Sequence, residues 1–301
     1  MRRPARPCLL LLFAACGANI TGTAETAHDA GVVDTARVPD ATADALTLGP
    51  WSAPAAFPAG ATSVDEDDVT LSSTALEMIF AVSGATGKTL YYTSRKAIGA
   101  AWSQIEPLPF SSTMSDETPR FSGDDMTLYF SSDRNKTAGD LDVYTVSRTM
   151  TGSNAAWGKV APVPGINTTV VEKWFAPCGN GRFVVVQART DTGTDLLEGT
   201  LGGAAPAPLD VLNSAMSETG AFLTQDCLTI YFASNRNTRV QIFVSHRKAI
   251  DQPWQQPVTV DDFKIGAGTD NQEDPWLSPD GRTFAFASDA SGSKDIYLST
   301  R

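Results

Sequence analysis

A pattern of about fifty residues recurs along this chain, and no other feature limits its possible folds as strongly. Residues 95–102 (RKAIGAAW) match residues 247–254 (RKAIDQPW). A second pattern aligns residues 126–132 (MTLYFSS), 228–234 (LTIYFAS) and 283–288 (TFAFAS). Self-similarity at this period indicates a chain built from repeated supersecondary units.

Each repeat contains short apolar runs that are rich in β-branched and aromatic residues and bounded by Gly, Asp, Asn and Ser. Such runs are typical of strands buried on both faces. Every repeat has room for four strands, and the units begin near Ser63, Ser111, Ile166, Asn213 and Lys264. The spacing predicts an all-β fold, namely a five-bladed β-propeller of four-stranded antiparallel blades.

The outermost strand of a blade carries a Trp in most units, at positions 51, 102, 157 and 254, and residues 204–209 take its place in the unit that lacks one. The last repeat stops after its third strand, whereas residues 51–58 (WSAPAAFP) resemble the outer strand at 102–109 (WSQIEPLP). We therefore expect the N-terminal strand to complete the last blade and close the ring, which pairs an otherwise free edge. The alternative is an open array with an unpaired last sheet.

Two segments carry a family resemblance. Residues 117–132 (ETPRFSGDDMTLYFSS) and residues 273–281 (EDPWLSPDG) resemble a WD40-like repeat of the TolB type. The resemblance extends over roughly residues 47–301 and implies a periplasmic or surface propeller that binds a partner and rarely catalyses. The Ser-Pro-Asp-Gly turn is intact only in the fifth unit, and the six blades and additional N-terminal domain of TolB are not found in this sequence.

The N-terminus has the features of a targeting segment. Three arginines precede a short apolar run, and Ala14-Ala15-Cys16-Gly17 resembles a bacterial lipobox, in which Cys16 is lipidated. An ordinary signal peptide with a chance cysteine is the alternative. We predict an exported outer-membrane lipoprotein, periplasmic or surface-facing, that contacts the membrane only through its anchor. The predicted regions are a signal peptide (1–15), the lipidated Cys with a disordered tether (16–46) and the propeller (47–301), with blades near 63–110, 111–165, 166–212, 213–263, and 264–301 plus 51–58.

The charge balance and the shortage of histidine limit the chemistry. A net charge of −11 disfavours sequence-independent nucleic-acid binding and favours cations or basic partners. The chain has only two histidines, His28 and His246, so a Ser-His-Asp triad or a zinc cluster is not expected.

Acidic residues precede the inner strand of every repeat and would surround one mouth of the channel. Arginines recur four residues after the second-strand aromatic or Val, which predicts the cross-strand ion pairs Glu117–Arg134, Glu172–Arg189 and Glu218–Arg236. The first and fifth blades lack that arginine, so we expect their acids to form an unpaired patch that could bind a ligand or a divalent cation. The patch comprises Glu66, Asp67, Asp68, Glu273, Asp274 and Asp289, with Trp276 nearby.

Cys178 and Cys227 occupy the turns between first and second strands of adjacent blades, so an exported protein could join them by a disulfide; two free thiols are the alternative. We expect a monomeric, non-catalytic binding or scaffold module for an envelope protein, a glycan or a cation. No catalytic residue and no cofactor is assigned. A glycoside hydrolase that uses channel carboxylates is the enzymatic alternative.

Overall fold

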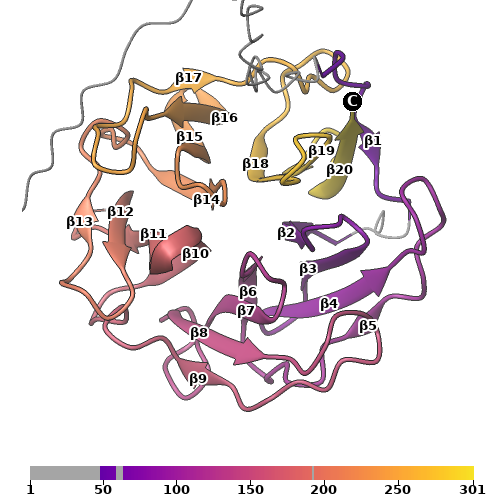
Figure 1. Cartoon of the computed structure of the whole chain (residues 1–301), viewed down its shortest axis with the longest axis horizontal. Coiled ribbons are helices and arrows are strands. Elements are labelled where there is room, and N and C mark those ends of the chain that lie inside the picture. Colours follow the sequence, from indigo (N-terminus) through magenta and orange to yellow (C-terminus); the bar gives the residue numbers. More distant parts are fainter. Residues whose placement is uncertain (1–47, 59–63, 192) are drawn as a thin grey trace, which may run out of the picture. The chain divides into compact units, whose positions relative to one another are not determined.

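The computed structural model describes residues 48–58, 64–191 and 193–301, and it contains five four-stranded antiparallel sheets arranged around a central axis (Figure 1). The predicted five-bladed β-propeller is therefore confirmed. The predicted signal peptide, Cys16 and most of the tether lie outside the described residues. The inner strands of the five blades are β2 (Glu66–Leu71), β6 (Asp116–Phe121), β10 (Glu172–Pro177), β14 (Glu218–Leu223) and β18 (Gln272–Leu277).

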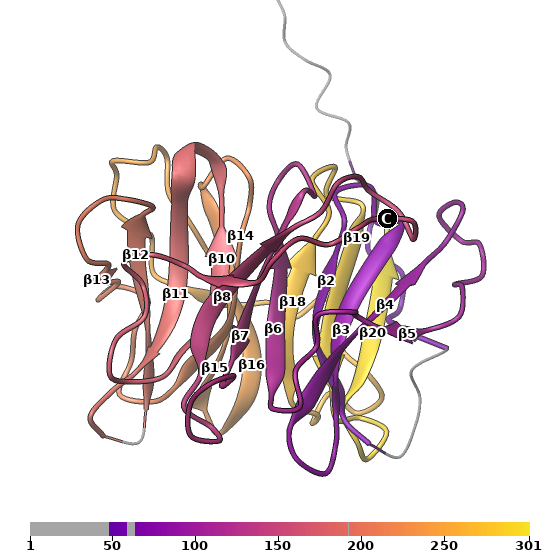
Figure 2. The same ribbon diagram turned by 90° about the horizontal axis from the view of Figure 1, so that it is seen from below.

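The second and third strands of each blade carry most of the apolar residues. The second strands are β3 (Glu77–Ser83), β7 (Thr127–Ser132), β11 (Arg182–Ala188), β15 (Thr229–Asn237) and β19 (Thr283–Ser288). The third strands are β4 (Lys88–Ser94), β8 (Asp142–Ser147), β12 (Thr194–Thr200), β16 (Arg239–His246) and β20 (Asp295–Thr300). The core lies between neighbouring sheets, because residues of adjacent blades pack together there, for example Ile79 and Leu90 against Phe130 and Tyr144. Figure 2 views the ring from its side, and the strands of these sheets stand next to one another there.

The outer strands are short: β5 (Glu106–Pro107), β9 (Ala161–Pro162), β13 (Ala207–Pro208), β17 (Val258–Thr259) and β1 (Ala55–Ala56). Strand β1 pairs with β20, with Ala55 opposite Leu298. The Arg301 guanidinium lies over the Trp51 ring at 4.1 Å, as Arg95 lies over Trp102 at 4.4 Å. The predicted closure of the ring by an N-terminal strand is thus confirmed.

Every inner strand contains a β-bulge at the same place. The pairing of β2 with β3 shifts between Asp67 and Thr70, and the other four blades show the same shift. The residue in the bulge has a positive φ in each blade: Asp68, Thr118, Trp174, Gly220 and Asp274. A bulge redirects a side chain locally, and here it provides a ring of five side-chain positions around the channel.

Apart from the short 3-10 turn Gly179–Gly181, the described residues form no helix. None of their segments is therefore a helix of the length and apolarity that crossing a membrane requires.

Candidate functional site

The bulge residues close the middle of the channel. The Trp174 Nε1–H donates to Asp274 Oδ1 (2.8 Å) and to Asp68 Oδ1 (3.1 Å), although these residues belong to three different blades. The Asp68 backbone N–H donates to Asp274 Oδ2 at 3.1 Å. Gly220 contributes no side chain at its place in the ring, and a Cβ there would lie only 2.8 Å from the Asp274 nitrogen. Trp174 therefore bridges the first and fifth blades across the axis.

A network of acids and lysines lies at the mouth where the inner strands begin, which we call the start mouth. The Lys88 ammonium contacts both oxygens of Asp67 (2.7 Å each) and Asp68 Oδ2 (2.8 Å). Lys173 bonds Glu117 Oε2 at 2.7 Å. Lys294 pairs with Glu273 and lies 3.4 Å from Asp67 Oδ2. Cations from three blades thus neutralise the carboxylates that face this mouth.

Burial and neighbouring charges raise the pKa of some of these acids and lower the pKa of another. Burial raises the pKa of Asp274 to about 7, and the charges of Asp68 and Glu273 act in the same direction. Burial, together with repulsion from Asp68, likewise raises the pKa of Asp67 to about 7. Burial also opposes ionisation of Asp68, but Lys88 and Lys173 outweigh it and hold the pKa of that carboxyl below its usual range. Asp68 is therefore the permanently ionised acid at the centre of the network.

One oxygen each of Asp67, Glu273 and Asp274 lie within 4.8 Å of one another, a spacing that could hold a metal ion. The Lys88 and Lys294 ammonium groups already provide positive charge to Asp67 and Glu273. A metal ion at this place would have to displace at least one of these lysines.

Arg120 lies below the bulge ring, toward the mouth where the inner strands turn into the second strands, which we call the turn mouth. Its guanidinium donates to the carbonyls of Val69, Ala221 (3.3 Å) and Pro275 (3.3 Å), which belong to three other blades. The residue is 2% exposed, and no carboxylate among the described residues forms a salt bridge with it. Burial accordingly lowers the pKa of Arg120. The negative charges of Asp274 and Asp68 act in the opposite direction but do not outweigh the burial.

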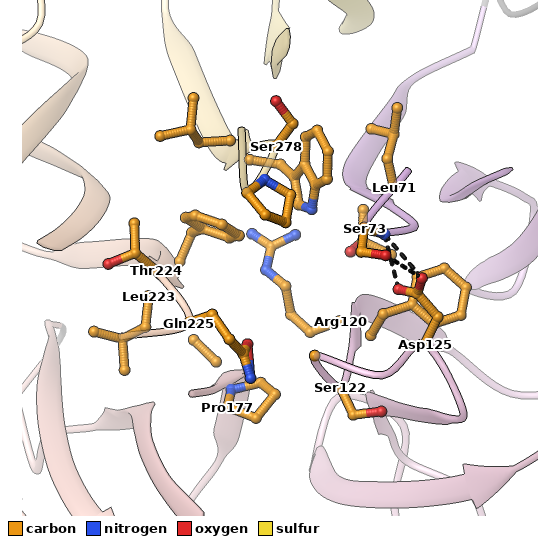
Figure 3. A pocket seen from close by; sticks show the side chains of 18 of the residues that line it. Leu71, Ser73, Arg120, Ser122, Asp125, Pro177, Leu223, Thr224, Gln225 and Ser278 are labelled. Atoms are coloured by element: carbon orange, nitrogen blue, oxygen red, sulfur yellow. Dashed lines mark hydrogen bonds between the residues drawn. The ribbon is translucent and has the colours of Figure 1, made fainter. Parts of the chain in front are cut away.

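A cavity of about 300 Å³ opens at the turn mouth, with Arg120 in its lining (Figure 3). Its wall is mainly apolar, and its rim carries polar groups, including Asp125, which accepts hydrogen bonds from the Ser73 N–H and hydroxyl. All five inner strands contribute to the lining, which includes Leu71, Phe121, Ala176, Pro177, Phe222, Leu223, Gln225, Trp276 and Pro279. An apolar pocket with a few converging polar groups is the usual form of a ligand site.

A disulfide joins Cys178 to Cys227 in two turns of this same mouth, with an S–S distance of 2.06 Å and a Cα–Cα distance of 5.5 Å. The Gly179 N–H donates to the Gln225 carbonyl beside it at 2.9 Å. The two turns that border the cavity on the side of blades three and four are therefore held together covalently.

Of the three ion pairs expected from the arginine repeat, the structure contains Glu218–Arg236 (2.9 Å). The predicted pair Glu117–Arg134 is wrong, because Arg134 bonds Asp116 at 2.7 Å. Successive side chains of a strand point to opposite faces, so Asp116 faces the arginine whereas Glu117 faces the channel and Lys173.

The predicted pair Glu172–Arg189 is also wrong. The Gln187 amide donates to Glu172 Oε1 at 2.9 Å and takes the place of the arginine. Arg189 turns outward to Asp191 and Asp195, at 2.8 Å from each.

The expected unpaired acidic patch is not present as such. Asp67, Asp68 and Glu273 pair with lysines, and Glu66 is buried. Trp276 lies at the opposite mouth and lines the turn-mouth cavity. Asp289, in the turn after β19, accepts hydrogen bonds from the N–H and side-chain amide of Asn271, so it holds the loop before β18 and is not part of the network.

Reasoning from the sequence missed the residues that occupy the channel. At the positions of Arg120 and Trp174 the other repeats have different residue types. Lys88 and Lys294 stand at equivalent positions of blades one and five, directly before Thr89 and Asp295 of the third strands, whereas Lys173 lies in an inner strand. Departure from the repeat is the signal that could have identified Arg120 and Trp174, because a residue that breaks a repeat serves something other than the blade.

Comparison with known proteins relates the chain to solved propellers. No protein-family model and no curated protein sequence matches it. Similar structures include an endo-arabinase from Bacteroides thetaiotaomicron (10% identity, 84% of this chain and 98% of that chain, TM-score 0.57) and an α-L-arabinofuranosidase from Podospora anserina in complex with cellotriose (10% identity, 84% and 96%, TM-score 0.52).

TolB from Acinetobacter baumannii is also similar (14% identity, TM-score 0.45), and the alignment covers 84% of this chain and 55% of that protein, just over half of its length. Identities this low concern the fold alone. By its fold, this chain is a closed five-bladed β-propeller, and this fold is similar to those of the endo-arabinase and the α-L-arabinofuranosidase.

Proposed function

We propose that this chain is a non-catalytic binding module whose ligand site is the turn-mouth cavity. The observation that carries the proposal is that side chains fill the start mouth and the middle of the channel but leave a cavity at the turn mouth. Lysines bond the start-mouth carboxylates and Trp174 bridges the middle, whereas the turn mouth keeps a cavity of about 300 Å³. A pocket of this size and apolar character suits one or two side chains of a partner protein.

The glycoside hydrolase alternative requires two carboxylates with free access to a sugar, one as acid and one as base or nucleophile. Asp67, Glu117 and Glu273 are instead engaged by ammonium groups. Assays on arabinan and xylan are expected to show no turnover. Turnover that is lost in both Asp67→Asn and Glu117→Gln would contradict the non-catalytic assignment.

Export fits the proposal, since the Cys178–Cys227 disulfide suits an oxidising compartment. We propose in addition that Cys16 is lipidated and anchors the module in the outer membrane. Metabolic labelling with palmitate tests this directly. Incorporation should be lost in Cys16→Ala, and a wild-type chain that takes up no label contradicts the anchor.

The binding proposal can be tested with peptides selected on the full chain from a displayed library. Gln225 is exposed and lines the cavity, so Gln225→Trp should fill part of it. Gln256 is exposed and lies outside the lining, so Gln256→Trp is the matched control. Selected peptides are expected to bind wild type and Gln256→Trp alike and to lose at least about tenfold in affinity for Gln225→Trp. Equal binding to all three proteins would place the site elsewhere.

A further inference from the structure

The outer strand of every blade pairs with the third strand on one side only. In an antiparallel pair, the N–H and carbonyl of successive residues point alternately toward the partner strand and away from it. One residue of each outer segment donates its N–H inward, to a carbonyl of the third strand: Leu108 to Leu90, Val163 to Val143, Leu209 to Leu196, Val260 to Ile242 and Phe57 to Ile296. The residue before each of these donors therefore points its N–H and carbonyl outward, where another strand can pair.

Proline closes this outward edge in most blades. The outward residue is Pro107 in blade one, Pro162 in blade two and Pro208 in blade three. Blade five has Ala56 at this place, but Pro58 follows two residues later, where the chain turns. Proline has no N–H to donate, and it protects exposed sheet edges from pairing with other chains. The edges of these four blades are therefore poor templates for a further strand.

Blade four departs from this pattern. Its outward residue is Thr259 of β17, which keeps its N–H. The next outward position is Asp261, which precedes the turn, whereas the corresponding residue of each other blade already lies in a turn. Thr259 and Asp261 thus offer two outward N–H groups in succession, and Pro257 and Thr259 offer two outward carbonyls. An antiparallel strand needs this alternation of donors and acceptors.

The side chains of this edge also suit a paired strand. Val258 is 61% exposed, the highest value for a large apolar side chain among the described residues. It lies opposite the half-buried Val244 of β16, so the two side chains share one face of the sheet. The equivalent positions of the other outer strands hold smaller or charged residues, namely Glu106, Ala161, Ala207 and Ala55. Only in blade four does an apolar side chain stand beside the open backbone groups.

The charge around this edge favours a basic occupant. Residues 251–262 include three exposed aspartates, Asp251, Asp261 and Asp262, and contain no lysine or arginine. Two copies of the chain paired through this edge would bring these acids together, and each copy has a net charge of −11. Such repulsion disfavours a dimer. A strand with basic side chains is attracted by the same acids.

We propose that the outer edge of blade four binds an extended, basic segment of a partner protein, which adds a fifth strand antiparallel to β17. Figure 1 shows β17 on the outside of the ring. The N–H groups of Thr259 and Asp261 donate to carbonyls of the added strand, and its own N–H groups donate to the carbonyls of Pro257 and Thr259. An apolar side chain of the partner covers Val258. This site lies outside the channel and does not depend on the turn-mouth cavity.

The test uses a dye-labelled peptide, acetyl-Thr-Lys-Val-Thr-Val-Lys-Thr-amide, whose binding to the full chain is followed by fluorescence anisotropy. Thr259→Pro gives blade four the proline of blades one, two and three, and it should weaken binding at least about tenfold. Ala56→Pro makes the same change in blade five, and this matched control should bind the peptide as wild type does. Equal binding to all three proteins, or no binding to wild type at about 1 mM peptide, overturns the proposal.

Hydrogen exchange of the wild-type chain locates the peptide without any substitution. The amides of Thr259 and Asp261 should exchange rapidly in the free chain and slowly with the peptide bound, because the added strand accepts their hydrogen bonds. The exchange of Ala56 should stay unchanged. Protection that spares Thr259 and Asp261 would place the peptide elsewhere and contradict the assignment.

Two further measurements test the class of partner. The same peptide with glutamate in place of both lysines should bind at least about threefold more weakly at low salt, and added salt should reduce this difference. Equal binding of the two peptides at low salt contradicts a basic partner. Light scattering should find the wild-type chain monomeric. A wild-type dimer that Thr259→Pro dissociates would assign the edge to a second copy of the chain and overturn the proposal.

Discussion

The two mouths of the channel use charge in opposite ways. At the start mouth, each of Asp67, Asp68, Glu117 and Glu273 is bonded by one of three lysines. At the turn mouth, the buried Arg120 bonds backbone carbonyls and no carboxylate among the described residues, and it lines an open cavity.

The difference teaches that a ring of acids is not by itself a binding site. The acids that recur in the sequence pair with lysines of the same chain. The cavity lies instead at the opposite mouth, where all five inner strands contribute to its lining. Four predictions test whether the two mouths are as independent as this comparison implies.

The largest effect is expected from Arg120→Met, which removes a cation that bonds carbonyls of three other blades. These buried carbonyls would lose their donors, so the free energy of unfolding should fall by about 3–5 kcal/mol. Urea denaturation of the full chain measures the loss. Arg95→Met, which removes an arginine that donates to one carbonyl, that of Ala75, is the control and should cost clearly less. Equal losses would show that Arg120 does not hold the blades together.

Removal of the disulfide should rank next. Cys178 and Cys227 are 49 residues apart, and opening a loop of this length lowers stability by about 4 kcal/mol. Denaturation of Cys178→Ser/Cys227→Ser measures the change. Because the disulfide lies at the turn mouth, affinity for selected peptides should fall while the start-mouth carboxyls keep their pKa values. A pKa change of Asp67 would indicate that the mouths are coupled.

Trp174→Phe tests the bridge between the mouths. The variant keeps an aromatic ring but loses the Nε1–H that bonds Asp68 and Asp274, so stability should fall by about 1–3 kcal/mol. Trp254→Phe removes the same volume from a tryptophan whose Nε1 has no partner, and it is the matched control. The hydrogen-bond explanation fails if both variants lose the same stability.

The smallest effect concerns pH. The folded pKa of Asp274 is about 7 and its ordinary value is 3.8, so the folded chain holds more protons between these values. The stabilising contribution of the neutral carboxyl is complete below about pH 4 and is lost as the pH rises through 7.

Asp274→Asn removes this loss and keeps an oxygen that can accept the Trp174 Nε1–H. Between pH 6 and pH 7, the wild type should therefore lose about 1 kcal/mol more stability than the variant. Paired denaturation curves at the two pH values measure the difference. Parallel behaviour of wild type and variant would show that Asp274 does not change its ionisation state in this range.

Much of the fold could be predicted because repetition carries the signal. The five units, their four strands and the closing strand at residues 51–58 follow from patterns such as Arg95–Trp102, which recur at a constant spacing. The partners of the acids were harder to predict, because the register of each inner strand decides which of two adjacent acids faces the arginine. The choice of Glu117 over Asp116 was therefore wrong, although Glu218 was placed correctly.

The sequence by itself determined the architecture of this protein, because each blade buries the same apolar pattern and the pattern is local. Only the tertiary structure decided what occupies the channel. Trp174, Asp68 and Asp274 lie far apart in the chain and meet only once five bulges point inward around one axis.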